Sequence, residues 1–193
     1  MIAHVKYSAV VIGVSAGGLA ALSKITENIP SGYSTPIIIV QHRVKDQRDL
    51  LEDLLQSKCS IEVKQADEKE KIKPGVIYIA PPDYHLLIES DKTFSLSADQ
   101  VVSYSRPSID VLFETAAMVY KKKLIGIILT GASSDGAEGI IAIKNSGGLT
   151  IAQDPTEAAF PFMPKAAIAT NAIEHVLSLK EIIKLLIQVS NHE

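Results

Sequence analysis

Residues 10–19 read VVIGVSAGGL, a run of β-branched residues that passes directly into a glycine-rich turn. Consecutive Val and Ile residues without polar alternation are typical of a strand that is buried on both faces. Apolar residues then recur at helical spacing as far as Ile29, and Pro30 follows them. The stretch therefore predicts a strand, a tight turn and an amphipathic helix, which is the unit from which parallel α/β sheets are built.

The same alternation of strand and helix continues along the chain. We expect strands at 8–14, 36–40, 124–129 and 149–152, and further helices at 49–56, 108–120, 135–145 and 179–189. Short segments separated by Pro, Gly and Asp turns predict a small antiparallel β insertion around 61–96. With 193 residues, we expect one domain over 1–193, an α/β fold with a doubly wound, mostly parallel sheet flanked by helices in a Rossmann-like three-layer arrangement.

The composition excludes several classes of protein. Apolar residues make up 47% of the chain, and a net charge of −3 with scattered basic residues argues against a nucleic-acid partner. Cys59 is the single cysteine, so we expect no internal disulfide, no cysteine cluster for zinc, and a cytoplasmic location. The longest apolar runs fall far short of the roughly 20 residues of a spanning helix, and residues 1–6 are too short for a signal peptide.

Polar residues follow the predicted strands, at the edge of a parallel sheet where ligands bind. Residues 13–17 form G-x-S-x-G on a strand-to-helix turn, the context in which a nucleophile elbow exposes a serine, here Ser15. The alternative is a glycine-rich turn whose amides bind a phosphate while Ser15 caps the helix. The spacing of Gly13, Gly17 and Gly18 does not match the dinucleotide pattern G-x-G-x-x-G.

A serine hydroxyl needs a base to remove its proton, and a neutral imidazole is the usual partner. His42 follows the second predicted strand, where adjacent parallel strands would bring it beside Ser15. His85, at the start of a short segment in the insertion, is the alternative base.

A buried carboxylate commonly orients such a histidine and stabilises its charged form. Asp135 is the candidate, because it follows a polar, glycine-bearing loop at the end of the 124–129 strand. Asp154 and Asp83 are further candidates, and the alternative role of Asp135 is to cap the helix at 135–145.

Seven sequence blocks, taken together, resemble a known family. They are IGVSAGG (12–18), VQH (40–42), KPGVIYIAP (73–81), SRPSIDVLF (105–113), ILTG (128–131), TIAQ (150–153) and MP (163–164). In this order they resemble the catalytic domain of the chemotaxis protein-glutamate methylesterases, the CheB-type family, through nearly the whole chain.

The resemblance implies a cytoplasmic chemotaxis esterase, without metal or cofactor, that hydrolyses γ-glutamyl methyl esters on the cytoplasmic domain of methylated chemoreceptors. Some members also deamidate receptor glutamines. It places the nucleophile on Ser15, the base on His42 rather than His85, and the orienting acid on Asp135. The active-site turn and oxyanion hole then comprise Ala16, Gly17, Gly18 and the backbone amide of Ala132.

The chain departs from the family pattern in two respects. A hydroxyl residue usually follows the nucleophile, where this chain has Ala16. Members also usually carry an N-terminal receiver domain, whereas a strand is expected near the first residue here, so we expect a stand-alone catalytic domain that a separate receiver protein could regulate. Two other classes stay open: a silent receptor-array adaptor, and a nucleotide-binding domain that would be indifferent to Ser15→Ala.

Overall fold

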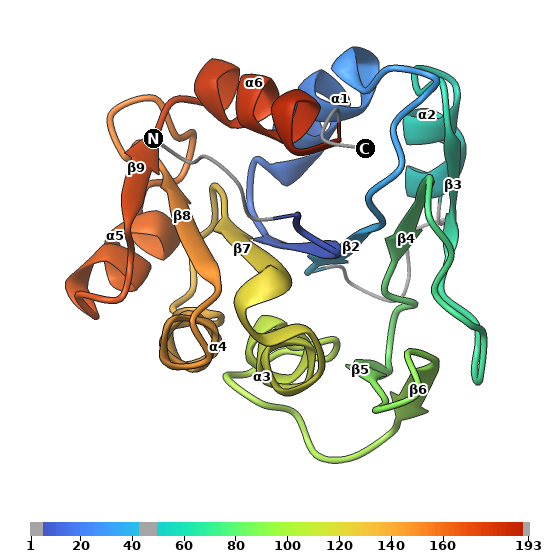
Figure 1. Ribbon diagram of the computed structural model, residues 1–193. Helices are drawn as coiled ribbons and strands as arrows, with labels where there is room; N and C mark the ends of the chain where they lie inside the picture. The colour runs from blue at the N-terminus through green and yellow to red at the C-terminus, as the bar shows by residue number, and fades with distance from the viewer. Residues whose placement is uncertain (1–5, 43–49, 191–193) are drawn as a thin grey trace.

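The computed structural model describes residues 6–42 and 50–190. Its main sheet has seven strands in the order β3-β4-β2-β1-β7-β8-β9, and every neighbouring pair is parallel (Figure 1). The strands are β1 (Ala9–Val14), β2 (Ile37–Gln41), β3 (Glu62–Gln65), β4 (Val76–Ile79), β7 (Leu124–Ile128), β8 (Leu149–Gln153) and β9 (His175–Leu177). The strand order reverses at β1, between β2 and β7, and such a switch point is where open α/β sheets bind ligands.

Helices cover both faces of the sheet (Figure 1). One face carries α1 (Gly18–Asn28), α2 (Leu51–Gln56) and α6 (Leu179–Ser190), and the other carries α3 (Ile109–Tyr120), α4 (Ala137–Asn145) and α5 (Phe162–Ala169). Along β1, Val10 and Ile12 face the first layer while Ala9 and Val11 face the second. Every residue of β1 is buried, which explains why its sequence is a continuous apolar run. The parallel sheet with helices on both faces confirms the predicted doubly wound α/β fold.

The predicted antiparallel insertion is confirmed, but it is smaller than 61–96. It consists of β5 (His85–Ile88) and β6 (Phe94–Ser97), paired as a separate two-stranded sheet. The segments β3 and β4 instead belong to the main parallel sheet. All four residues of β4 are buried, as expected for an inner parallel strand covered on both faces.

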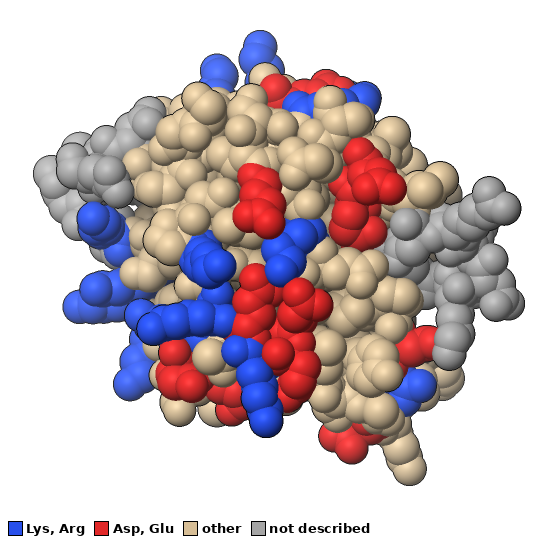
Figure 2. Space-filling view, turned by 90° about the vertical axis from the view of Figure 1, so that its right-hand side faces the viewer, with Lys and Arg blue, Asp and Glu red and all other residues tan. Residues whose placement is uncertain are grey.

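The two edge strands of the main sheet carry polar side chains. On β3, Glu62 is exposed and Lys64 pairs with Asp67 and Glu70 at 3.0 and 2.9 Å. Figure 2 shows acidic and basic side chains intermingled on the face that carries this edge. Charged edges of this kind hinder pairing with the sheets of other molecules. The opposite edge, β9, is three residues long and none of them is buried, which is why the sequence did not predict it.

Most expected helices begin and end within a few residues of the predicted bounds. The helix predicted at 49–56 is α2, and residue 49 lies outside the described residues. The Pro-flanked segment 160–171 contains α5. Within residues 6–42 and 50–190, no helix is both long and apolar enough to cross a bilayer.

Candidate active site

Ser15 lies on the sharp turn between the end of β1 and the start of α1. Its amide donates to the carbonyl of Thr130 at 3.0 Å, which fixes the turn against the end of β7. Gly17 has φ +76°, in the left-handed region that favours glycine. A Cβ at Gly18 would collide with the side chains of Gln41 and Val14. The glycines therefore allow the chain to turn sharply at the carboxyl edge of the sheet.

His42 lies at the end of the adjoining strand. The register pairs Val14 with Gln41, and the His42 amide donates to the carbonyl of Val14 at 3.1 Å. Ser15 directly follows Val14 and His42 directly follows Gln41, and neighbouring strands lie about 4.8 Å apart. The backbones of Ser15 and His42 are therefore close together. The adjacency of these two residues, expected from a local crossover, is present in the structure.

Asp135 comes from the loop after β7 and pairs with His42. The distance between His42 Nε2 and Asp135 Oδ2 is 2.7 Å, and the Asp135 side chain is buried. A carboxylate can only accept hydrogen bonds, so Nε2 carries the proton of neutral His42 and Nδ1 carries the free lone pair. The atom available to act as a base is therefore Nδ1.

The Asp135 carboxylate lies at the N-terminus of α3. It accepts hydrogen bonds from Ser108 Oγ at 2.8 Å, the Ile109 amide at 2.7 Å and the Asp110 amide at 3.1 Å. Burial alone would raise the pKa of Asp135, but the hydrogen bonds from His42, the two amides and Ser108 outweigh it and hold the pKa below its usual value. Asp135 is thus a carboxylate at neutral pH.

This placement excludes the alternative role of Asp135 as a helix cap. Asp135 does not cap its own helix, since Gly136 occupies the N-cap position of α4 and no side chain caps that helix. Ser108 does occupy the N-cap position of α3, but its hydroxyl donates to Asp135 rather than capping the helix. The amides of α3 and the Ser108 hydroxyl together form an anion site for Asp135.

The alternative residues lie in other settings. His85 is buried and uses both ring nitrogens: Nδ1 accepts the Ser108 amide at 3.2 Å, and Nε2 donates to the Gln100 carbonyl at 3.0 Å. It therefore supports the start of α3. Asp154 binds the amide and hydroxyl of Thr156 in an exposed turn. Asp83, with φ +66°, lies in the turn before β5.

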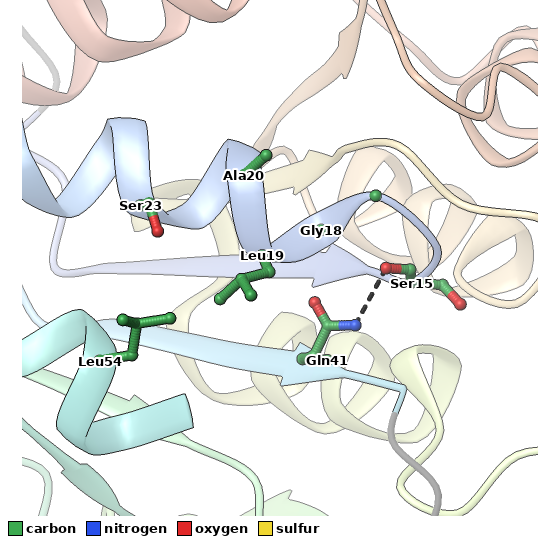
Figure 3. Close-up of a pocket in the computed structure, with 8 residues that line it drawn as sticks. Ser15, Gly18, Leu19, Ala20, Ser23, Gln41 and Leu54 are labelled. Carbon is green, nitrogen blue, oxygen red and sulfur yellow. Dashed lines mark hydrogen bonds between the residues drawn. The ribbon is translucent and has the colours of Figure 1, made fainter. Parts of the chain in front are cut away.

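Three residues whose hydrogen bonds connect the segments of the site were not predicted from the sequence: Gln41, Thr130 and Gln153. Gln41 Nε2 donates to the main-chain oxygens of both Ser15 and His42, each at 3.0 Å; Figure 3 shows the bond to Ser15. Thr130 Oγ1 donates to the Ala16 carbonyl at 3.0 Å, and the Thr130 amide donates to Gln153 Oε1 at 3.0 Å. Their position at strand ends is the signal that could have identified them.

The amides near Ser15 differ in their availability. The Gly18 amide donates to the Ser15 carbonyl at 2.9 Å, and the Gly131 amide donates to the Phe160 carbonyl at 2.9 Å. Among the described residues, the amides of Ala16, Gly17 and Ala132 have no such main-chain partner. Of the residues expected around the oxyanion hole, Gly18 is therefore the one whose amide is already engaged.

An open groove of about 520 Å³ ends at Ser15 (Figure 3). It lies between the exposed face of α1 and α2, and its walls include the half-exposed Leu19 and Leu54. The lining residues are Ser15, Gly17, Gly18, Leu19, Ala20, Ser23, Gln41 and Leu54. The described chain contains no group of three or more His, Cys, Asp or Glu side chains placed to hold a metal ion.

Gln41→Leu is expected to lower turnover about 10- to 100-fold with little change in KM, because two carbonyls that set the positions of Ser15 and His42 lose their shared donor. Gln56→Leu is the matched control. Gln56 also bridges main-chain groups, through Cys59 and Ile61, but away from the site. Equal activity of the two variants in steady-state kinetics would contradict a positioning role for Gln41.

Asp110→Asn is expected to stabilise the fold at high pH. Burial, and then the negative charge of Asp135, raise the pKa of Asp110 to about 7, although the Gly139 amide donates to it at 2.8 Å. The folded chain thus keeps a proton that the unfolded chain releases near pH ~4. Raising the pH from about 4 to about 7 therefore lowers the free energy of unfolding, and above pH ~7 the loss is complete.

Urea unfolding at several pH values tests this expectation. The Asp110→Asn variant should exceed the wild type in stability by a few kcal/mol at pH ~8, and the two curves should converge below pH ~4. Asp53→Asn, which changes an exposed acid on α2, should show no such gain. A constant difference between Asp110→Asn and wild type across the pH range would contradict the raised pKa.

The fold and the site together define a class of protein. A doubly wound parallel sheet whose carboxyl edge gathers a serine on a tight turn, an imidazole and a buried carboxylate is a hydrolase-type α/β domain. The family model described as CheB methylesterase matches residues 10–186. The chain belongs to the CheB methylesterase family, so the resemblance seen in the sequence is confirmed.

Individual relatives agree with this assignment. A Leptospira interrogans protein, provisionally named protein-glutamate methylesterase/protein-glutamine glutaminase, is 51% identical over 186 residues and covers 96% of both chains. The Clostridium acetobutylicum protein-glutamate methylesterase/protein-glutamine glutaminase is 34% identical over 181 residues, which are 94% of this chain and 52% of that one. The crystal structure of the Thermotoga maritima CheB methylesterase catalytic domain matches with a TM-score of 0.90 at 36% identity, covering 96% of this chain and 100% of that domain. The chain is thus an enzyme, a carboxylic ester hydrolase of the methylesterase type.

Proposed function

We propose that this chain hydrolyses γ-glutamyl methyl esters on the cytoplasmic domains of methylated chemoreceptors, with Ser15 as nucleophile, His42 as base and Asp135 as orienting acid. The observation that carries the proposal is the 2.7 Å pair of His42 Nε2 and buried Asp135, next to Ser15 on the adjoining strand end. The same chemistry would act on a glutamine amide with ammonia as the leaving group, which is a proposed second activity.

The reaction begins when His42 Nδ1 takes the proton of Ser15 and Oγ attacks the ester carbonyl. The developing oxyanion accepts hydrogen bonds from free amides, for which Ala16, Gly17 and Ala132 are the candidates. Each such donor is worth roughly 10² to 10³ in turnover. His42 returns its proton to the departing methanol, and water, activated by the same nitrogen, then hydrolyses the glutamyl-serine ester.

Asp135 stabilises the imidazolium that forms on His42 during both steps. It stays ionised because the hydrogen bonds at the N-terminus of α3 hold its pKa low. Ala16 lacks the hydroxyl that the family usually has after the nucleophile. Here Thr130 supplies a hydroxyl to the same turn from the end of β7, through its 3.0 Å bond to the Ala16 carbonyl. We therefore propose that the turn is held in place without a hydroxyl at position 16.

We also propose that the described residues form a single catalytic domain that works in the cytoplasm, with a receiver as its regulatory partner. The proposal of a single domain is supported by the main sheet, because β1 and β9, which lie near opposite ends of the described chain, both belong to it. The phosphate-binding alternative loses support because the Gly18 amide is engaged within the turn.

Methanol release from a methylated chemoreceptor fragment, in neutral buffer without a phosphodonor, tests the proposed function. We expect release by the wild type, and inhibition by a serine-directed fluorophosphonate that leaves its adduct on Ser15. A folded wild-type chain that releases no methanol would overturn an esterase that is active without its receiver.

A further inference from the structure

Ser105 lies beside the nitrogen that the proposed mechanism needs. Its hydroxyl oxygen is 3.3 Å from His42 Nδ1, while Nε2 of the same ring is engaged by Asp135 at 2.7 Å. Since Nδ1 is the unprotonated nitrogen, the Ser105 hydroxyl is the donor. Among the described residues, the hydrogen bond to Nδ1 comes from Ser105 and not from Ser15.

Nδ1 has one lone pair, so it accepts one well-aligned hydrogen bond. The Ser15 hydroxyl must donate to this nitrogen before its proton can be transferred. Ser105 and Ser15 therefore compete for the same acceptor. Every hydrogen bond that Ser105 makes to Nδ1 keeps the base from the nucleophile.

The backbone around Ser105 is fixed by its own hydrogen bonds. The Ser105 amide donates to the Val102 carbonyl at 2.9 Å, and the Val102 amide donates to the Ser105 carbonyl at 3.2 Å. Arg106 Nη1 donates to the carbonyls of Ala98 and Asp99 at 2.8 and 2.9 Å. These bonds hold the Ser105 backbone beside His42, so that a rotation about χ1 alone moves the hydroxyl to or from Nδ1.

We propose that Ser105 is a positioning residue that occupies the base in the resting enzyme, and that its hydroxyl must turn away from His42 before Ser15 reacts. The inference rests on the proposed function of the same site. It assigns to Ser105 a restraining effect: the residue holds the imidazole in place and lowers the fraction of molecules in which Ser15 is activated.

Ser105→Ala tests the proposal through a readout that a merely structural role would not move in this direction. The readout is the rate at which ethoxy fluorophosphonate labels Ser15, followed by mass spectrometry. We expect labelling about two- to tenfold faster than in the wild type, the effect of removing one competing neutral hydrogen bond.

Two variants serve as controls. Ser105→Thr keeps a hydroxyl and is expected to label at the wild-type rate. Ser103→Ala removes an exposed hydroxyl from the same loop and is expected to leave the labelling rate unchanged. Labelling of Ser105→Ala that is unchanged or slower than in the wild type overturns the proposal. If the wild type does label at Ser15 and releases methanol, such a result overturns the role of Ser105 alone; if no variant labels at Ser15, the proposed function falls with it.

Discussion

Ser15→Ala is expected to lower methanol release from a methylated receptor fragment by at least about 10⁴-fold, because no other group replaces the attacking oxygen. The fold should persist, since the contacts that hold this turn use the main chain of residue 15: its amide donates to Thr130 and its carbonyl accepts Gln41 Nε2. Single-turnover measurement of methanol release, beside a thermal unfolding curve, separates loss of chemistry from loss of structure.

Ser23→Ala provides the matched control for this experiment. Ser23 lines the same groove but lies further along α1 than the turn that carries Ser15. Removing its hydroxyl should leave the rate of methanol release within about twofold of the wild type. Methanol release by Ser15→Ala at a rate close to that of Ser23→Ala would exclude Ser15 as the nucleophile. Such a result would favour a binding module or a reaction carried by a different residue.

Asp135→Asn is expected to lower turnover by about 10⁴-fold, the loss that the corresponding Asp-to-Asn substitution causes in serine proteases. The two oxygens of Asp135 accept four donors, and an asparagine has only one oxygen. Its NH₂ group would face N–H or O–H donors, leaving buried polar groups without acceptors. His42 would also lose the carboxylate that keeps the proton on Nε2, so Nδ1 would no longer be the free base.

Because Asp135→Asn can weaken the fold as well as the reaction, further variants are needed to separate the two effects. Ser108→Ala removes one of the four donors and should fold, with a smaller loss of turnover than Asp135→Asn. Asp154→Asn, in an exposed turn, should retain wild-type kinetics. Steady-state kinetics and circular dichroism melts on all three test the expectation. If folded Asp135→Asn keeps turnover within tenfold of wild type, Asp135 does not orient the base.

The β1 turn and its neighbours could be predicted because their signals are local. The buried run at 10–14, the glycines and the helical spacing up to Ile29 all lie within one short stretch. Candidate residues at strand ends followed from the parallel sheet, since every carboxyl end lies on one edge. Ser15, His42 and Asp135 could therefore be singled out before the structure was known.

The supporting residues could not be predicted in the same way, because their roles depend on contacts between distant segments. Ser108 reads as a helix cap from its neighbours alone, and only the approach of the loop after β7 turns its hydroxyl toward Asp135. Likewise, the run at 76–79 is short enough to fit either the antiparallel insertion or the main parallel sheet. In the structure it is buried on both faces and pairs with β2 in the parallel sheet. The sequence also contains no local signal that Ser105 reaches His42.

The position of Asp135 at the N-terminus of α3 has a consequence for the end of the reaction. Among the described residues, its hydrogen-bond donors are two helix amides, the Ser108 hydroxyl and the His42 imidazole rather than a lysine or arginine. Within the described chain, the residues that line the groove likewise include no cation. A newly formed glutamate carboxylate would thus meet no positive charge on these lining residues, so within the described groove the acid product gains no ion pair that the neutral ester lacked.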